Sequence, residues 1–485
     1  MNGPTRRLAS ILFMGFLVLL GSVTWIQVIA ADRYRNDPRN VRTSISESGK
    51  ERGVIVTGDG TVLARSEPSA DDPQSFVRIY PEGPAYAPVV GYTSRLAGSA
   101  GVEAAFADEL RSRRDLTPSD MISAIFGRDL RPRSVQVAII PELQQLAFET
   151  LGANRGAVVA LDPRTGDVLA YVTSPTYDPQ DLADPEGLEN REILLADLDG
   201  PLRDRAGNEL LRPGSSFKAV VAASAFESGN FSPESLFDDP VAFQLPGSTA
   251  TIANFGDGLC GDGGQVTLEV AFIRSCNTVF ADLAIQLGAE QVGRTSEALG
   301  FSEPIGMPWD TTASLFPTEE LEADAAALGQ SGIGERDVRA TPLQMAMVAS
   351  AIANGGEMMS PRVVTQLFDA DGETVEAFGP RSLGAPLSVA TADVLTEMME
   401  RVVTEGTGRQ AALRGVRVAG KTGTAQGVDA APDVWFIGFA PVEDPAIAIA
   451  VMVEDGGESG GSATGGGVAA PIAAAVIDRW LSIRP

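Results

Sequence analysis

The sequence contains no histidine, and this absence excludes whole classes of chemistry. Without imidazole, neither a Ser-His-Asp hydrolase nor a His-ligated zinc site can be built. Two cysteines are too few for a cysteine-based structural zinc site, so we expect no metal. A net charge of −27 speaks against nucleic acid as a partner, because phosphate binding needs clustered Lys and Arg. Any serine nucleophile in this chain must therefore use a base other than histidine.

Lysine is almost as scarce as histidine. Only Lys50, Lys218 and Lys421 occur among the 37 basic residues, and arginine supplies all the others. A guanidinium stays protonated in proteins, whereas a lysine in a dry pocket can lose its proton and accept one from a hydroxyl. Lys50 lies in a polar linker, where we expect it to be solvated. Lys218 and Lys421 are the candidates for chemistry.

The chain is long enough for two or three domains. Residues 8–31 carry no charged side chain, and these 24 residues span about 36 Å as a helix, enough to cross a bilayer. We expect a transmembrane anchor after a short cytoplasmic tail at 1–7; the alternative is a cleaved signal peptide. Residues 32–154 show no catalytic motif and are expected to form a β-rich pedestal. A second domain is expected over 155–485, opening with a hairpin at 156–174.

The stretch "PGSSFK" contains a serine and a lysine three residues apart. Pro-Gly before it and Gly229 after it predict a helix that begins near Ser215. Within that helix, Ser215 and Lys218 share one face, one turn apart, whereas Ser216 points elsewhere. The helix amino terminus also favours developing negative charge. We therefore expect Ser215 to be the nucleophile and Lys218 its base, although this spacing alone is a weak signal.

The stretch "KTGT" lies in an alternating segment, residues 416–426. The two apolar runs after it predict further strands of one antiparallel sheet. The small residue Gly423 allows a substrate backbone to approach the strand closely. Lys421 and the hydroxyls of Thr422 and Thr424 are suited to hold a carboxylate. A solvated strand lysine is the alternative interpretation.

A Ser-x-Asn element occurs at two places between these motifs. The first, at 228–230, lies at the far end of the Ser215 helix, about 20 Å from the nucleophile by helix rise. The second comprises Ser275 and Asn277, between two expected helices, where a loop can turn both side chains toward a cleft. We select the second.

Taken together and in this order, "SSFK", "SCN" and "KTGT" are a strong signal. The chain resembles the penicillin-binding proteins and serine β-lactamases, over roughly 155–485. The stretches "TPLQMAMVASAIANGG" (341–356), "DVWFIGFAP" (433–441) and "GGGVAAPI" (465–472) reinforce the resemblance. The small pedestal is similar to that of monofunctional class B members, most nearly the penicillin-binding protein A group. Residues ahead of 155 are too few, and lack the acidic pair, for the glycosyltransferase domain of a bifunctional class A protein.

The resemblance implies an α/β (α+β) fold. A serine β-lactamase/transpeptidase-like domain would contain a five-stranded, mainly antiparallel sheet flanked by helices, joined to the pedestal and one transmembrane helix. It also implies a membrane-anchored peptidoglycan D,D-transpeptidase that needs no cofactor. Implied partners are peptidoglycan stem peptides, β-lactam antibiotics, membrane lipid around 8–31, and proteins of cell-wall synthesis or division. The catalytic domain would lie outside the cytoplasm.

The resemblance assigns a role to each motif residue. Ser215 would attack the carbonyl between two terminal D-alanines after giving its proton to the "SSFK" lysine, and an amine of a neighbouring stem would take the acyl group. The N–H groups of Ser215 and Thr424 would form the oxyanion hole. Ser275 would relay a proton to the departing D-alanine, and Asn277 would hold the substrate amide. Lys421 and Thr424 would bind the terminal carboxylate.

Two other functions share these motifs. A D,D-carboxypeptidase or β-lactamase would pass the acyl group to water, but 306–316 lacks the Glu-x-x-Leu-Asn stretch that the commonest lactamases use to activate water. A non-enzymatic scaffold for wall-synthesis proteins is the third possibility.

Cys260 and Cys276 are separated by 16 residues, and an oxidising compartment would allow them to pair. Such a bridge would be worth about 3 kcal/mol by loop closure. Two unpaired thiols are an equally weighted alternative.

Overall fold

The computed structural model describes residues 3–26, 30, 49–70, 72, 75–111, 131–183, 186–426 and 431–484. Near the amino terminus, helix α1 runs over Gly3–Thr24. Its apolar window, Arg6–Thr24, has a mean hydropathy of 1.9 and no buried part, so by length and composition it can cross a membrane. Gly465–Ile483 meets the same criterion, but it is one-third buried within the folded part. Residues 27–29 and 31 of the expected anchor lie outside the described residues.

A five-stranded antiparallel sheet supports the second half of the chain, in the order β17-β18-β19-β7-β8. The expected hairpin at 156–174 and the three expected carboxyl-terminal strands are confirmed as members of this sheet. Its strands are β7 (Gly156–Leu161), β8 (Val168–Ser174), β17 (Ala419–Ala425), β18 (Asp433–Ala440) and β19 (Ile447–Val453). Strand β17, with "KTGT", forms one edge.

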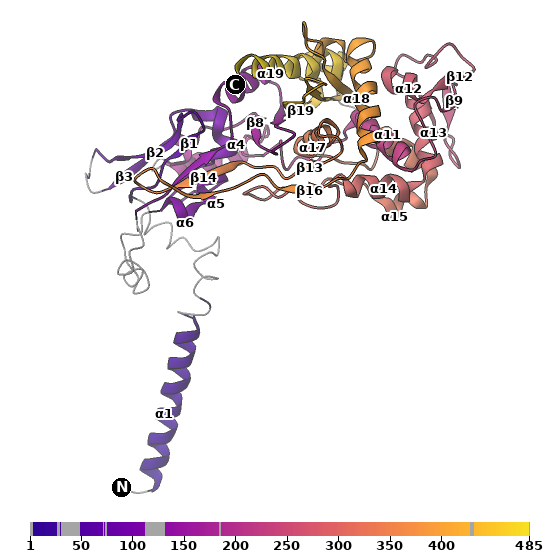
Figure 1. The fold of residues 1–485 in the computed structure, drawn as a ribbon. Coiled ribbons are helices and arrows are strands. Elements are labelled where there is room, and N and C mark those ends of the chain that lie inside the picture. The colour runs from indigo at the N-terminus through magenta and orange to yellow at the C-terminus, as the bar shows by residue number, and fades with distance from the viewer. Residues whose placement is uncertain are drawn as a thin grey trace.

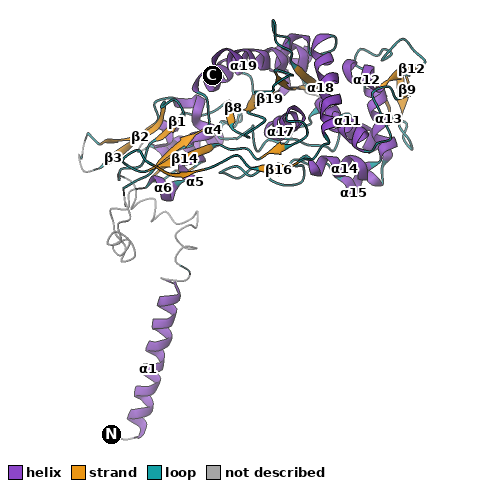
Figure 2. Cartoon of the chain, in the orientation of Figure 1, coloured by secondary structure: helices purple, strands orange, loops and turns teal. Residues whose placement is uncertain are grey.

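Both faces of this sheet are covered by helices, which explains why its strands are apolar on both sides. Alternate residues point to opposite faces. One set, including Phe436, packs with helices α8 (Pro141–Leu151) and α19 (Ala470–Ile483). The other set, including Ile437, packs with α17 (Pro342–Ala353). Figure 2 shows α17 and α19 on different sides of β19.

A group of helices extends from the α17 side of the sheet, away from the pedestal (Figure 2). Two of these helices begin with motif residues, α11 with Lys218 and α13 with Asn277. Helix α18 packs against β17, and α11 contacts α13, α14 and α18. Their bounds are α11 (Lys218–Glu227), α12 (Leu268–Arg274), α13 (Asn277–Leu287), α14 (Ala289–Ala298), α15 (Thr318–Glu322), α16 (Ala325–Gly332) and α18 (Val389–Thr404). Small two-stranded sheets lie beside them: β9 (Leu236–Asp238) with β12 (Gln265–Thr267), β10 (Ala242–Gln244) with β11 (Thr251–Ala253), and β13 (Met358–Met359) with β16 (Ser382–Gly384).

The pedestal is built on a six-stranded sheet to which the second half of the chain contributes two strands. The order is β15-β14-β6-β1-β2-β3, and Figure 1 shows orange β14 among the indigo and violet pedestal strands. The strands are β1 (Ile55–Thr57), β2 (Val62–Pro68), β3 (Phe76–Ile79), β6 (Ser134–Val137), β14 (Val364–Phe368) and β15 (Thr374–Ala377). The two halves of the chain therefore share a hydrogen-bonded sheet.

Short elements complete the pedestal and the segment that leads from β8 toward the nucleophile. They are α4 (Ala87–Val90), β4 (Thr93–Ser94), β5 (Gly98–Ser99), α5 (Gly101–Ala105), α6 (Ala107–Leu110), α9 (Pro179–Ala183) and α10 (Gly187–Ala196).

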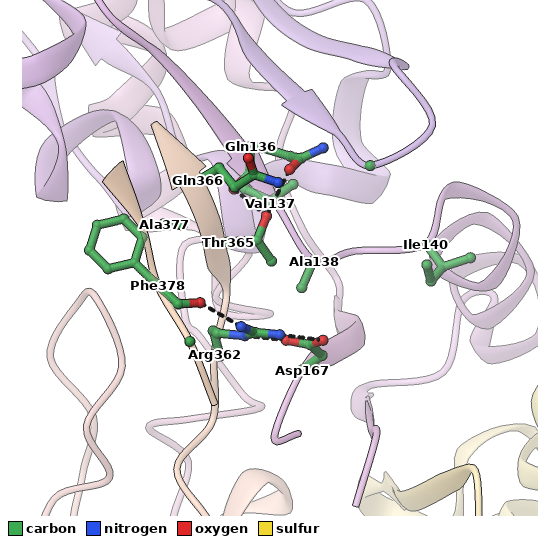
Figure 3. A pocket seen from close by; sticks show the side chains of 12 residues that line it. Gln136, Val137, Ala138, Ile140, Asp167, Arg362, Thr365, Gln366, Ala377 and Phe378 are labelled. Carbon is green, nitrogen blue, oxygen red and sulfur yellow. Dashed lines mark hydrogen bonds and ion pairs between the residues drawn. The ribbon is translucent and has the colours of Figure 1, made fainter. Parts of the chain in front are cut away.

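An ion pair ties the turn between β7 and β8 to the segment that leads into β14, beside a cavity of about 590 Å³ (Figure 3). Arg362 donates two hydrogen bonds to the carboxylate of Asp167, at 2.5 and 2.8 Å, and a third to the carbonyl of Phe378 at 2.5 Å. Bidentate pairs of this kind fix geometry as well as adding energy. The cavity contains no motif residue, and we treat it as part of the joint.

Candidate active site

The nucleophile motif forms a tight turn at the edge of the five-stranded sheet. Residues Gly214–Phe217 form a 3-10 turn, and α11 follows directly from Lys218. The helix was expected to begin at Ser215, so its regular part starts three residues later than predicted. In a 3-10 turn, side chains at i and i+3 are eclipsed, which keeps Ser215 and Lys218 on one side. Ser215 is half-buried, whereas Ser216 is fully buried and donates to the Pro213 carbonyl at 2.6 Å. This arrangement agrees with choosing Ser215 over Ser216.

Glycine allows the nucleophile turn to lie directly against strand β17. A Cβ on Gly423 would come within 2.5 Å of the Pro213 carbonyl oxygen and 3.1 Å of the Ser216 nitrogen. Gly214 has φ +52°, and a Cβ there would come within 2.8 Å of the Thr424 carbonyl carbon and oxygen. Gly423 was expected to make room for a substrate. The structure instead fills that space with the chain's own nucleophile turn.

Lys218 is fully buried and its amine has two protein acceptors. Nζ donates to the Ser275 carbonyl at 2.7 Å and to Asn277 Oδ1 at 2.8 Å. Burial lowers the pKa of Lys218 well below its ordinary value, and the positive charge of Lys421 lowers it further. A neutral amine has two N–H donors and one lone pair. With both donors engaged, the lone pair is free to accept a proton.

Ser275 connects the two lysines of the site. Its carbonyl accepts from Lys218, and its hydroxyl accepts from Lys421 Nζ at 2.8 Å. Ser275 adopts the left-handed conformation, with φ +62° and ψ +41°, at the end of α12. Non-glycine residues rarely adopt this conformation, and it persists where the surroundings enforce it. The backbone turn lets one residue face both amines.

Lys421 is also fully buried, on the sheet face that carries Ile437. Burial lowers the pKa of Lys421 to about 7. Its Nζ lies 5.7 Å from the centre of the Phe272 ring, and Lys218 Nζ lies 5.5 Å from that of Phe280. Aromatic faces partly compensate the cost of a buried cation. The solvated-lysine alternative for Lys421 is therefore wrong.

Asn277 is the first residue of α13, and its carboxamide is held from both ends. Oδ1 accepts from Lys218, and Nδ2 donates to the Ala253 carbonyl at 3.0 Å. The competing Ser-x-Asn at 228–230 lies beyond the opposite end of α11 from Lys218. The structure thus brings together Ser275, Asn277 and both buried lysines.

The two threonines of "KTGT" lie on the opposite face of β17 from Lys421, because successive residues of a strand alternate. Residues directly opposite across β17 and β18 lie on one face, so Thr422 shares the Phe436 side of the sheet. The Thr422 hydroxyl is 2.5 Å from that of Thr407, and Thr422 is 5% exposed. Thr424 Oγ1 accepts from the Gly465 amide at 3.2 Å and is half-buried. Strand alternation therefore places the Lys421 ammonium on the face that holds Ser275, and the hydroxyls of Thr422 and Thr424 on the other face.

Cys260 and Cys276 are joined in a disulfide, with their Cα atoms 5.6 Å apart. The bond ties the loop after β11 to the middle residue of Ser-x-Asn. Arg274 Nη1 also donates to the Cys260 carbonyl at 2.8 Å. The residues on either side of Ser275, Arg274 and Cys276, are therefore both bonded to Cys260.

Glu335 is a charged group beside the site that the sequence analysis did not select. Its carboxylate accepts from the Gln426 amide at 2.8 Å, just beyond β17, and pairs with Arg212 at 3.3 Å. Burial raises the pKa of Glu335, and its negative charge partly opposes the lowering of the Lys218 pKa. No local pattern marks this glutamate, because only the fold brings residue 335 to the end of β17.

The comparisons with known proteins cover nearly the whole chain. Residues 156–478 match the model of the penicillin-binding protein transpeptidase domain, and residues 52–135 match the penicillin-binding protein A dimerisation domain. The chain belongs to the penicillin-binding protein transpeptidase family. It is 40% identical to the peptidoglycan D,D-transpeptidase PbpA of Mycolicibacterium smegmatis, across 98% of each chain. It is a serine-type peptidoglycan D,D-transpeptidase.

Solved structures of relatives agree with this family assignment. The ceftriaxone acyl-enzyme of penicillin-binding protein A from M. tuberculosis matches with a TM-score of 0.83 and 36% identity, over 90% of this chain and 99% of that one. Its penicillin G acyl-enzyme matches with a TM-score of 0.81 and 37% identity, over 89% and 100%. The expected fold class and the resemblance to the penicillin-binding protein A group are confirmed.

Proposed function

We propose that Ser215 is the nucleophile of this transpeptidase and that neutral Lys218 is its general base. The observation that carries the proposal is the burial of Lys218, with two N–H donors engaged and a lowered pKa, one turn from a half-buried serine. Ser215 Oγ attacks the carbonyl between the two terminal D-alanines of a stem peptide while Lys218 takes its proton. The amide C–N bond then breaks, and D-alanine leaves with a proton relayed through Ser275.

The tetrahedral intermediate carries an oxyanion that needs N–H donors. We assign these donors to the backbone amides of Ser215 and Thr424, since the nucleophile turn and β17 are in contact around Gly214 and Gly423. Asn277 orients both Lys218 and the substrate amide. Lys421 acts on the Ser275 hydroxyl, to which its Nζ donates alongside a hydrogen bond to the Thr422 carbonyl at 3.1 Å. The half-buried Thr424, on the edge strand, receives the substrate carboxylate.

An amine from a neighbouring stem peptide then attacks the acyl-enzyme, forms the cross-link and releases Ser215. A β-lactam would acylate Ser215 in place of the stem peptide, as ceftriaxone and penicillin G do in the two structures of the M. tuberculosis relative. The roles of the individual residues, Thr422 and Gly423 included, belong to the proposal.

We further place the protein in the cell membrane, with α1 as its anchor and the folded part outside the cytoplasm. The apolar helix supports the anchor, and the disulfide fits an oxidising compartment. Proteins of cell-wall synthesis or division are the expected neighbours there. Protease digestion of intact and opened cells tests the topology: cleavage of the folded part only after the membrane is opened would contradict it.

Fluorescent penicillin tests the nucleophile. We expect wild type and Ser216→Ala to be labelled and Ser215→Ala to remain unlabelled. Ser216→Ala is the matched control, because it removes the adjacent hydroxyl from the same turn. Equal labelling of Ser215→Ala and wild type would refute the assignment. Release of D-alanine from a pentapeptide, with and without an acceptor amine, then separates transfer from hydrolysis: product that never contains the acceptor would indicate a carboxypeptidase.

A further inference from the structure

The helix that carries Asn277 begins without a cap of its own. Its N-cap residue is Cys276, whose side chain makes no capping hydrogen bond and whose sulfur is in the disulfide. The first amides of a helix have no partner within the helix and need an acceptor from elsewhere. Ser, Thr, Asp or Asn usually provides one from the N-cap position. Here the middle residue of Ser-x-Asn cannot.

Asn254, just beyond β11, supplies this cap from another part of the chain. Its Oδ1 accepts from the Asn277 amide at 2.8 Å, the Thr278 amide at 3.1 Å and the Thr278 hydroxyl at 3.3 Å. Its Nδ2 donates to the Gly258 carbonyl at 3.1 Å, which orients the oxygen toward α13. Asn254 is 8% exposed, so water competes little for these groups.

The same segment fixes the Asn277 side chain. The Ala253 carbonyl accepts from Asn277 Nδ2 at 3.0 Å, so Oδ1 of that carboxamide has to face Lys218. Residues 253 and 254 thus hold both the backbone and the side chain of Asn277. A continuous series of hydrogen bonds leads from Asn254 through Asn277 to the Lys218 amine.

We propose that Asn254 is a positioning residue for acylation: it caps α13 in place of Cys276 and thereby holds Asn277 and Lys218 in register with Ser215. The inference rests on the proposed function, because it requires Lys218 to be the base. Asn254 touches none of the reacting groups that we assign. Its removal should therefore slow the chemical step while leaving the noncovalent encounter with a β-lactam nearly unchanged.

The test measures labelling of the full-length protein in detergent by fluorescent penicillin at several concentrations. This separates the dissociation constant of the first complex from the acylation rate constant. We expect Asn254→Ala to lower the rate constant about tenfold or more, with less than about a threefold change in the dissociation constant. Asn254→Asp keeps the acceptor oxygens and should restore the rate to within about threefold of wild type. Asn230→Ala, an exposed asparagine after α11, is the matched control and should behave as wild type.

A purely structural role gives a different pattern. If Asn254→Ala lowers only the melting temperature or the fraction of protein that labels, while each labelled molecule reacts at the wild-type rate, the inference is wrong. It is equally wrong if Asn254→Asp is as slow as Asn254→Ala. Labelling of Ser215→Ala at the wild-type rate would overturn the proposed function, and this inference with it. Normal wild-type labelling with an unchanged Asn254→Ala rate would overturn the inference alone.

Discussion

Replacing Lys421 by methionine should make the protein more stable and less active. Methionine has a similar length and can pack against Phe272, but it carries no amine to bury. In the folded protein the pKa of Lys421 is about 7, compared with an ordinary value of 10.5. Between these values the unfolded chain binds a proton that the folded chain does not, so the stability of wild type rises with pH.

The size of the effect follows from the two pKa values. The proton linkage at Lys421 lowers the free energy of unfolding by about 4 kcal/mol at pH 7 and about 2 kcal/mol at pH 9. For a domain as long as residues 156–478, an unfolding entropy of roughly 0.7 kcal/mol per degree converts these values to about 6 °C and about 3 °C. Lys421→Met also loses the hydrogen bond to Ser275, which reduces its gain in free energy of unfolding by roughly 1 kcal/mol at both pH values.

Thermal unfolding of wild type and Lys421→Met at pH 7 and pH 9 measures this prediction. The variant should melt higher at pH 7, and its advantage should shrink by about 3 °C at pH 9. Lys50→Met removes the lysine outside both motifs and should not reproduce the gain at pH 7 that shrinks at pH 9. A melting difference between wild type and Lys421→Met that is the same at both pH values would show that this amine does not change its protonation on folding. Fluorescent penicillin labelling of the same variant should be lost.

Other perturbations test the neighbouring groups. Lys218→Arg should abolish penicillin labelling, because a guanidinium does not lose its proton. Wild-type labelling should speed up as pH rises through the lowered pKa of Lys218, because the neutral amine is the base. Equal pH profiles of the two proteins would contradict a lysine base. Ser275→Gly should slow acylation about tenfold and leave the free energy of unfolding nearly unchanged, because relief of the left-handed backbone, about 1 kcal/mol, is offset by loss of the hydrogen bond from Lys421. Retention of the full rate would exclude the hydroxyl relay. Cys260 and Cys276 should resist thiol labelling until reductant is added, and modification of both without reductant would disprove the bridge.

Local patterns were sufficient where the chemistry is carried by short motifs. The scarcity of lysine directed attention to Lys218 and Lys421, and both are buried at one site. Alternating apolar runs predicted β17, β18 and β19, because a strand covered on both faces has to be apolar along its length. The three motifs carried the resemblance to the family, and that resemblance implied the fold class and the five-stranded sheet.

Long-range pairing left no comparable local signal. Strand β14 joins the pedestal sheet by pairing with β6, more than 200 residues earlier in the chain, and β15 extends the sheet by pairing with β14. In the sequence these two strands look like an ordinary hairpin within the second domain, although Val364 and Leu367 of β14 are buried. The motif "KTGT" suggested that Lys421 and both threonine hydroxyls act together on a carboxylate. A motif written as consecutive letters hides the alternation that separates them.

The site shows why such details are hard to infer. Each of its main groups is unfavourable for folding when considered alone: two buried lysines, a serine in a conformation that suits glycine, and a helix whose N-cap cysteine cannot cap it. Substitutions chosen for stability alone would remove each of these features. Their combination has a chemical reason. Burial lowers the pKa of both amines, so that a neutral amine is available to accept a proton. The left-handed backbone of Ser275 places its carbonyl against Lys218 and its hydroxyl against Lys421. The contacts that hold this arrangement, from Asn254 and from the disulfide, come from a loop about 20 residues earlier in the chain. We therefore expect substitutions in that loop to change the acylation rate more than the melting temperature, the opposite of what core positions do.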